Sequence, residues 1–244
     1  MVNDSIPLNQ TPIDALILDL DGTLVDTLGD FSAALNLMLE ELALPAIASG
    51  QILTMVGKGT EHLLRSALAA VLAPEGEVSD GTAPQARRVE SLYPEALASY
   101  QRHYPQINGR HSQVYEGVAE GLAALQALGL PMACVTNKPL GFARPLLEAK
   151  GLAGYFRAVF GGDSFERKKP DPLPLIKTCE ALGTLPGRTL MVGDSSNDAR
   201  AAAAAGCPVA LLGYGYNHGQ PICTVRADAY LDSLAELPPM LSLG

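Results

Sequence analysis

The chain has 244 residues, 48% of them hydrophobic, which suffices for a full α/β domain and a small second domain. Its formal net charge of −9 argues against broad nucleic-acid binding. An anionic substrate must then be met by local positive charge from a metal, a lysine or a helix N-terminus. Because no apolar run approaches ~18 residues and the first fourteen residues do not resemble a secretory signal, we expect a cytoplasmic protein with no membrane partner. We also expect a monomer or homodimer.

The first predicted element is a strand over residues 15–18, a short apolar run that is typical of a strand buried on both faces of a parallel sheet. It ends in Asp19-Leu20-Asp21-Gly22-Thr23, and alternation along an extended chain points Asp19 and Asp21 the same way. Gly22 lets the chain turn and brings a backbone N–H close to a ligand. Since two like charges repel, we expect a divalent cation beside this pair, and Mg²⁺ prefers such oxygen ligands.

Residues 26–105 show helical patterns and no strand signal. Apolar residues recur at helix spacing in three places, and a short helical stretch is also expected; these four segments are 31–42, 52–56, 63–72 and 89–104. Residues 73–88 are rich in proline, glycine and charge and predict a surface loop. The block follows the first strand directly, so we expect it to be an insertion rather than a terminal domain.

From residue 106 onward, predicted strands alternate with predicted helices. The strands are 131–135, 158–160, 189–192, 208–212 and 229–231, and the helices are 118–128, 142–150, 172–182 and 199–205. This alternation predicts an α/β fold, a Rossmann-like doubly wound parallel sheet with helices on both faces. We expect residues 1–25 and 106–244 to form this core and residues 26–105 to form the inserted helical domain.

Polar residues follow several of these strands, where open α/β sheets bind ligands. Thr136 and Asn137 can hydrogen-bond phosphate oxygens without adding charge, although either could instead cap the next helix. Lys169 offers an ammonium group suited to a phosphate contact. Asp194 and Asp198 flank a strand-to-helix turn, and Asp198 could simply be an acid favoured by the helix dipole.

These segments resemble the four motifs of the haloacid dehalogenase superfamily and occur in that family's order over residues 15–212. Residues 19–23 match its Asp-x-Asp-Gly-Thr phosphatase signature. Thr136 stands at the position of its Ser/Thr, Lys169 directly precedes a proline, and residues 193–198 match Gly-Asp-Ser-x-x-Asp. The resemblance implies that the inserted helices form a cap over the active site.

The resemblance also implies roles for individual residues. Asp19 would attack phosphorus to give an aspartyl-phosphate, and Asp21 would be the general acid/base. Mg²⁺ would be held by Asp19, Asp194 and Asp21, the last through its backbone carbonyl. The phosphoryl group would be bound by Gly22, Thr23, Thr136, Asn137 and Lys169, with Asp198 in support.

Other activities remain open at this stage. Haloacid dehalogenases lack the second aspartate and need no metal, so Asp21 argues against that reaction. Phosphomutases keep both aspartates, and another small-phosphate phosphatase would share every motif. A catalytically idle sensor of a phosphorylated ligand is the alternative from a different class, and retention of Asp19, Asp21 and Lys169 argues against it.

Two further stretches concern the substrate. Gly215-Tyr216-Asn217-His218-Gly219 resembles a Gly-Tyr-Asn-x-Gly stretch of bacterial phosphoglycolate phosphatases, and Val56-Gly57-Lys58-Gly59 resembles the cap loop of that group. The resemblance implies a small phosphorylated metabolite as substrate, 2-phosphoglycolate, cleaved to glycolate and phosphate. Lys58 and Asn217 are the candidate specificity residues, since glycines beside Lys58 permit close approach to a ligand. The alternative is that both stretches are glycine-rich turns without a ligand role.

Overall fold

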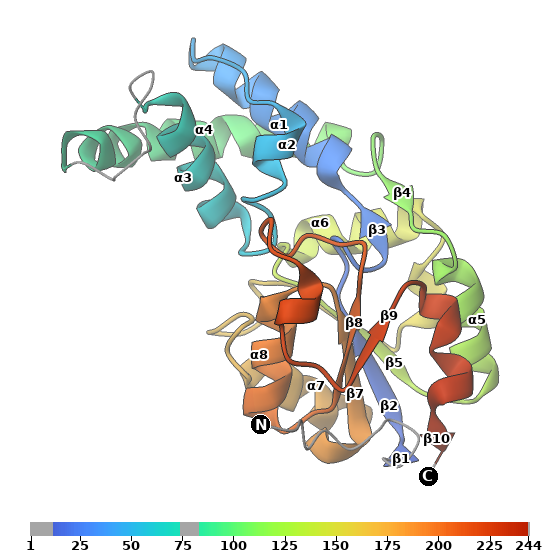
Figure 1. Cartoon of the computed structure of the whole chain (residues 1–244). Coiled ribbons are helices and arrows are strands. Elements are labelled where there is room, and N and C mark those ends of the chain that lie inside the picture. Colours follow the sequence, from blue (N-terminus) through green and yellow to red (C-terminus); the bar gives the residue numbers. More distant parts are fainter. Residues whose placement is uncertain (1–11, 74–82, 244) are drawn as a thin grey trace.

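A parallel six-stranded sheet forms the centre of the computed structural model, which describes residues 12–73 and 83–243 (Figure 1). The strand order is β6-β5-β2-β7-β8-β9, and every neighbouring pair is parallel. In chain order the strands are β2 (Ala15–Leu18), β5 (Met132–Val135), β6 (Ala158–Phe160), β7 (Thr189–Gly193), β8 (Val209–Leu212) and β9 (Ala229–Leu231). The predicted α/β fold is therefore confirmed.

Helices cover both faces of this sheet. They are α5 (Val118–Ala127), α6 (Leu140–Ala149), α7 (Leu173–Leu182) and α8 (Ser196–Ala205). Successive side chains of β2 point to opposite faces of the sheet. Leu16 and Leu18 pack in one apolar cluster with α5 and α6, whereas Ile17 packs in another with α7 and α8. The strand is buried on both faces, as its unbroken apolar run predicts.

Short elements complete the core. Two small sheets pair β1 (Pro12–Ile13) with β10 (Ser242–Leu243) and β3 (Val25–Asp26) with β4 (Gln113–Val114). The second pair lies where the chain leaves the core for the inserted helices and where it returns. The 3₁₀ helices are η2 (Ala153–Tyr155), η3 (Pro186–Arg188), η4 (Ile222–Thr224), η5 (Leu234–Glu236) and η6 (Pro238–Met240). The sequence analysis predicted none of these two- or three-residue elements.

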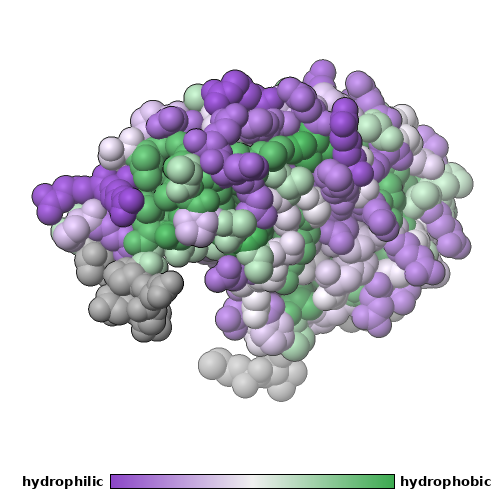
Figure 2. All heavy atoms as spheres, turned by 90° about the horizontal axis from the view of Figure 1, so that it is seen from above, coloured by the Kyte–Doolittle hydropathy of each residue, from purple (hydrophilic) through white to green (hydrophobic). Residues whose placement is uncertain are grey.

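The inserted helices form a block with an apolar core of its own. The helical block consists of α1 (Leu28–Glu41), α2 (Ser49–Ile52), α3 (Thr60–Val71) and α4 (Ala83–Ile107), and it lies above the sheet in Figure 1. Side chains such as Leu35, Leu64 and Tyr100 pack together inside it. Viewed from above, hydrophobic side chains gather at the left of the molecule, on the side of α3 and α4 (Figure 2).

The structure corrects two predicted boundaries in this block. Residues 83–88 were predicted as loop but belong to α4, because Pro84 stands in the first helical turn, where proline is tolerated, and good helix formers follow it. The rest of that predicted loop, 74–82, lies outside the described residues. The short helix ends at Ile52 instead of beginning there. In the described part of the chain, no helix is both long and apolar enough to cross a membrane.

Candidate active site

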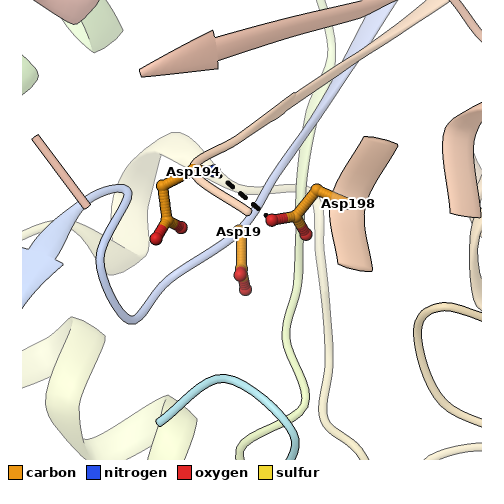
Figure 3. Close-up of side chains that lie close together, drawn as sticks. All are labelled: Asp19, Asp194 and Asp198. Carbon is orange, nitrogen blue, oxygen red and sulfur yellow. Dashed lines mark hydrogen bonds between the residues drawn. The ribbon is translucent and has the colours of Figure 1, made fainter. Parts of the chain in front are cut away.

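The predicted site residues converge because their strands are neighbours. Asp19 follows β2, Thr136 follows β5 and Asp194 lies just beyond β7, and β2 stands between β5 and β7 in the sheet. Carboxylate oxygens of Asp19, Asp194 and Asp198 lie within 4.8 Å of one another. Figure 3 shows Asp194 and Asp198 on either side of Asp19. Parallel strands with adjacent carboxyl ends thus bring together segments that are far apart in the sequence.

Asp194 is held rigidly. Its Oδ1 accepts a hydrogen bond from the Thr23 hydroxyl at 2.6 Å, and its Oδ2 accepts one from the backbone N–H of Tyr216 at 2.6 Å. A Cβ atom at Gly22 or Gly215 would come within 2.4 or 2.2 Å of Asp194, so only glycine allows the backbone this close on both sides. The carboxylate is therefore fixed in place before any ligand arrives.

Asp198 positions its neighbours. Its Oδ2 accepts hydrogen bonds from the Ser195 hydroxyl at 2.7 Å and the Ser195 N–H at 3.1 Å, which caps the start of α8. Its Oδ1 accepts one from Lys169 Nζ at 2.8 Å. Because one of these donors is Lys169, Asp198 can hold that ammonium in place, and its supporting role in the reaction stays a prediction.

Lys169 neutralises part of this charge. Its buried Nζ lies 2.7 Å from the Val135 carbonyl oxygen, 2.8 Å from Asp198 Oδ1 and 2.9 Å from Asp19 Oδ1. Burial raises the pKa of Asp19 to about 7, while the charge of Lys169 acts in the opposite direction. Burial, together with the charges of Asp198 and Asp19, also raises the pKa of Asp194. Three buried carboxyl groups beside one ammonium leave negative charge for a divalent cation to balance.

Four residues predicted to bind phosphate have other partners, and one of them is Lys169, whose Nζ lies beside three protein oxygen atoms. The Thr23 hydroxyl donates to Asp194, and the N–H groups of Gly22 and Thr23 donate to carbonyl oxygens within their own turn. Asn137 Nδ2 donates to the carbonyl oxygens of Gly57 at 3.0 Å and Lys169 at 2.8 Å. In this arrangement these groups position the site, and a direct phosphate contact by any of them stays a prediction.

Thr136 and Asp21 remain accessible from a small cavity between the strand ends and the helical block. Thr136 Oγ1 accepts a hydrogen bond from the N–H of Lys138 at 3.2 Å, which leaves its hydroxyl proton free to donate. The cavity has a volume of about 30 Å³, room for roughly one or two water molecules. The residues that line it include Asp19, Asp21, Phe31, Tyr104, Thr136 and Lys138.

Lys138 is a site residue to which the sequence analysis assigns no role. Its buried Nζ lies 3.0 Å from Asp21 Oδ1 and 2.5 Å from the hydroxyl oxygen of Tyr104 in α4. The same ammonium lies 4.5 Å from the ring centroid of Phe31 in α1. Its position directly after Thr136-Asn137 at a strand end was the available signal, the same one that identified Thr136.

The two predicted specificity residues lie elsewhere. Lys58 lines a second hollow of about 420 Å³ together with His62, Lys168 and Arg200. Asn217 Oδ1 accepts a hydrogen bond from the N–H of Ser196 at 2.9 Å, at the first residue of α8. In this arrangement neither side chain lines the cavity beside Asp19, because the loop that carries Lys58 presents Gly57 and Gly59 to that cavity instead.

Known proteins resemble this chain in sequence and in fold. The sequence matches the family model of haloacid dehalogenase-like hydrolases over residues 16–212. It is 43% identical to the phosphoglycolate phosphatase of Thiobacillus denitrificans, with 98% of each chain covered. It is 39% identical to that of Escherichia coli K12, with 95% of this chain and 93% of the relative covered. A crystal structure described as a predicted phosphoglycolate phosphatase from Haemophilus somnus superimposes with a TM-score of 0.85 at 33% identity, over 95% of this chain and 99% of that chain.

Proposed function

We propose that this chain, which belongs to the haloacid dehalogenase-like hydrolase family, is a Mg²⁺-dependent phosphatase that hydrolyses 2-phosphoglycolate to glycolate and phosphate. The observation that carries the proposal is the convergence of Asp19, Lys169 and Asp194 at one end of the sheet. The relatives named phosphoglycolate phosphatase, which match nearly the whole chain, support the choice of substrate.

The residues present fit a magnesium ion. Mg²⁺ prefers oxygen ligands, and the Asp19 and Asp194 carboxylates converge on one space with an excess of negative charge. Because the side chain of Asp21 is turned to Lys138, Asp21 would bind the ion through its backbone carbonyl instead. When bound, the ion would supply positive charge against the phosphate oxygens.

The chain's own residues then account for a two-step reaction. An Asp19 oxygen attacks phosphorus in line, the bond from phosphorus to the glycolate oxygen breaks, and Asp21 gives its proton to that oxygen. In the second step Asp21 takes a proton from water, the water oxygen bonds to phosphorus, and the bond from phosphorus to Asp19 breaks. The Thr136 hydroxyl donates to a phosphate oxygen, and Lys169, 2.9 Å from Asp19, offsets the negative charge around the nucleophile.

The helical block would act as the cap. It meets the core through the Gly57 carbonyl, which accepts from Asn137, and through Tyr104, which accepts from Lys138. The cavity beside Asp19 lies between the block and the core, so we expect the block to move away from the core when the substrate enters. Its return would exclude water while the phosphoryl group is transferred.

A phosphate-release screen tests this function. Purified protein is assayed on 2-phosphoglycolate, glucose 6-phosphate, glycerol 3-phosphate and an aryl phosphate, each with Mg²⁺ and with a chelator. We expect Mg²⁺-dependent release with the highest kcat/KM on 2-phosphoglycolate. A different ester preferred by more than tenfold would overturn the substrate, and no release from any ester would overturn the phosphatase.

A further inference from the structure

We propose that Lys138 recognises the carboxylate of the substrate and so selects phosphoglycolate over phosphate esters that lack this group. The inference rests on the proposed function, because it supplies what that function requires at the second end of the substrate. Phosphoglycolate has two anionic ends, and each must be met by a positive group when it is withdrawn from water.

Lys169 has no N–H left for the carboxylate end, because all three have acceptors in the core. Three oxygen atoms, from Val135, Asp198 and Asp19, surround its Nζ between 2.7 and 2.9 Å. Among the described residues that line the cavity, Lys138 is the one with a positively charged side chain. It therefore stands where a second anionic group of a ligand bound at Asp19 would need a partner.

Lys138 also retains a donor for such a ligand. The two Asp21 oxygens lie 3.0 and 3.4 Å from its Nζ, so one N–H can serve both of them, and a second serves the Tyr104 oxygen. The third N–H has no acceptor among the residues that the structure describes, which leaves it for a carboxylate in the cavity. Hydrogen bonds between opposite charges are strong in such a buried setting.

The helical block completes this binding position. The rings of Phe31 and Tyr104 lie over the ammonium at 4.5 and 4.9 Å and favour its positive charge without competing as anions. Both rings belong to the block, whereas Lys138 and Asp21 belong to the core. The binding position for the carboxylate is therefore complete only when the block lies against the core. Phosphoryl transfer is shielded from water in that same state.

Two esters that differ at one end test the proposal. 2-Phosphoglycolate and 2-hydroxyethyl phosphate share the phosphate and the two-carbon chain, but the second has a hydroxyl in place of the carboxylate. We expect Lys138→Met to lower kcat/KM for phosphoglycolate roughly 10- to 100-fold more than for 2-hydroxyethyl phosphate, the range for one charge-assisted hydrogen bond. The matched control is Lys177→Met, since the exposed Lys177 pairs with Glu180 on the surface of α7, away from the cavity, and it should leave both values unchanged.

Each other outcome decides against the proposal. Equal losses on both esters would mean that Lys138 only positions Asp21. A retained preference in Lys138→Met, lost instead in Lys58→Met, would move recognition to the loop of Lys58. If the unaltered enzyme shows no preference between the two esters, the proposed substrate itself fails. Thermal melting checks that the variant folds, and Lys138→Gln, which keeps a donor beside Asp21, is read in the same assay if it does not.

Discussion

The site has two halves, and each places a buried lysine beside an aspartate from the segment after β2. The lysine is Lys169 in the core half and Lys138 in the block half. The other partners of these two lysines lie in different parts of the molecule. Lys169 contacts Asp19, Asp198 and Val135, all in the α/β core. Lys138 contacts Asp21 in the core and Tyr104 in the helical block. The core half is thus complete wherever the block lies, whereas the block half exists only when the two parts meet.

This difference separates two tasks. Phosphate chemistry needs the nucleophile and its charges to be fixed in advance, because preorganised charges cost no reorganisation during reaction. Substrate selection benefits from a position that forms on closure, since binding energy is then linked to the shielded state. In the proposed scheme, the parallel strand ends carry out the first task and contacts across the interface with the block carry out the second.

The largest expected effect falls on the core half. Asp19→Asn keeps the shape of the side chain but removes the nucleophile, so turnover should fall on the order of 10⁴-fold or more. The variant should still fold, because the amide carries no negative charge in a buried site that raises the pKa of Asp19 to about 7. Phosphate release and thermal melting measure the two effects. Turnover within tenfold of the parent would remove Asp19 from the nucleophile role.

Metal removal should be nearly as severe. Chelation should stop hydrolysis and Mg²⁺ should restore it, whereas Ca²⁺ should substitute poorly because it favours longer and looser coordination. Asp194→Ala should raise the Mg²⁺ concentration needed for half-maximal rate by at least roughly tenfold, since it removes a carboxylate held in place by Thr23 and Tyr216. The shift of the melting temperature by Mg²⁺, measured without substrate, provides a second readout. Normal hydrolysis by a fully demetallated sample would contradict the metal site.

Asp198→Asn tests whether Asp198 holds Lys169 in position within the core half. One carboxylate now serves both the cap of α8 and Lys169, and an amide that keeps its oxygen toward the cap would turn its NH₂ toward the Lys169 ammonium. We expect kcat to fall roughly 10- to 100-fold through displacement of Lys169. The free energy of unfolding should fall by less than the ~3–5 kcal/mol of a broken buried pair, because Asp19 still faces Lys169. Urea unfolding at fixed pH measures the second value; an unchanged kcat would show that Asp198 does not position Lys169.

The core half was predictable from sequence for a physical reason. Asp19, Thr136 and Asp194 each follow a short apolar run, and any parallel sheet gathers the ends of such runs at one edge. The block half was not predictable in the same way. The sequence places Tyr104 at the end of a predicted helix, but it does not show that its hydroxyl meets Lys138, since that contact depends on how two separately packed parts dock.

Lys58 is a second case in which the sequence did not predict a side-chain contact. The glycines beside it indicate a close approach of the backbone, and Gly57 and Gly59 do line the cavity. Tertiary packing sets the direction of the Lys58 side chain and places it in the second hollow, which Lys168 also lines. The local sequence thus identified the correct loop, but the positively charged side chain in the cavity is that of Lys138, from a different segment.

The smallest expected effect falls on the block half. Tyr104→Phe removes the hydroxyl that accepts from Lys138 but keeps the ring over the ammonium and its stacking on Tyr100. A typical hydrogen bond contributes about 1 kcal/mol, so kcat/KM for phosphoglycolate should fall roughly 3- to 10-fold. Tyr93→Phe, on the same helix but away from the cavity, is the matched control and should change little.

The double variant then shows whether the two halves are independent. If the core half is complete without the block, the free-energy effects of Asp198→Asn and Tyr104→Phe on kcat/KM should add within about 0.5 kcal/mol, as expected for sites with no shared partner. Their contacts are joined through the Asp19–Asp21 segment and through residues 135–138, where Val135 accepts from Lys169 and Asn137 donates to the Lys169 carbonyl. Lys169 and Lys138 nevertheless have no acceptor in common among the described residues. A coupling above about 1 kcal/mol would mean that closure of the block also sets the position of the nucleophile, and the division between fixed chemistry and closure-dependent selection would no longer hold.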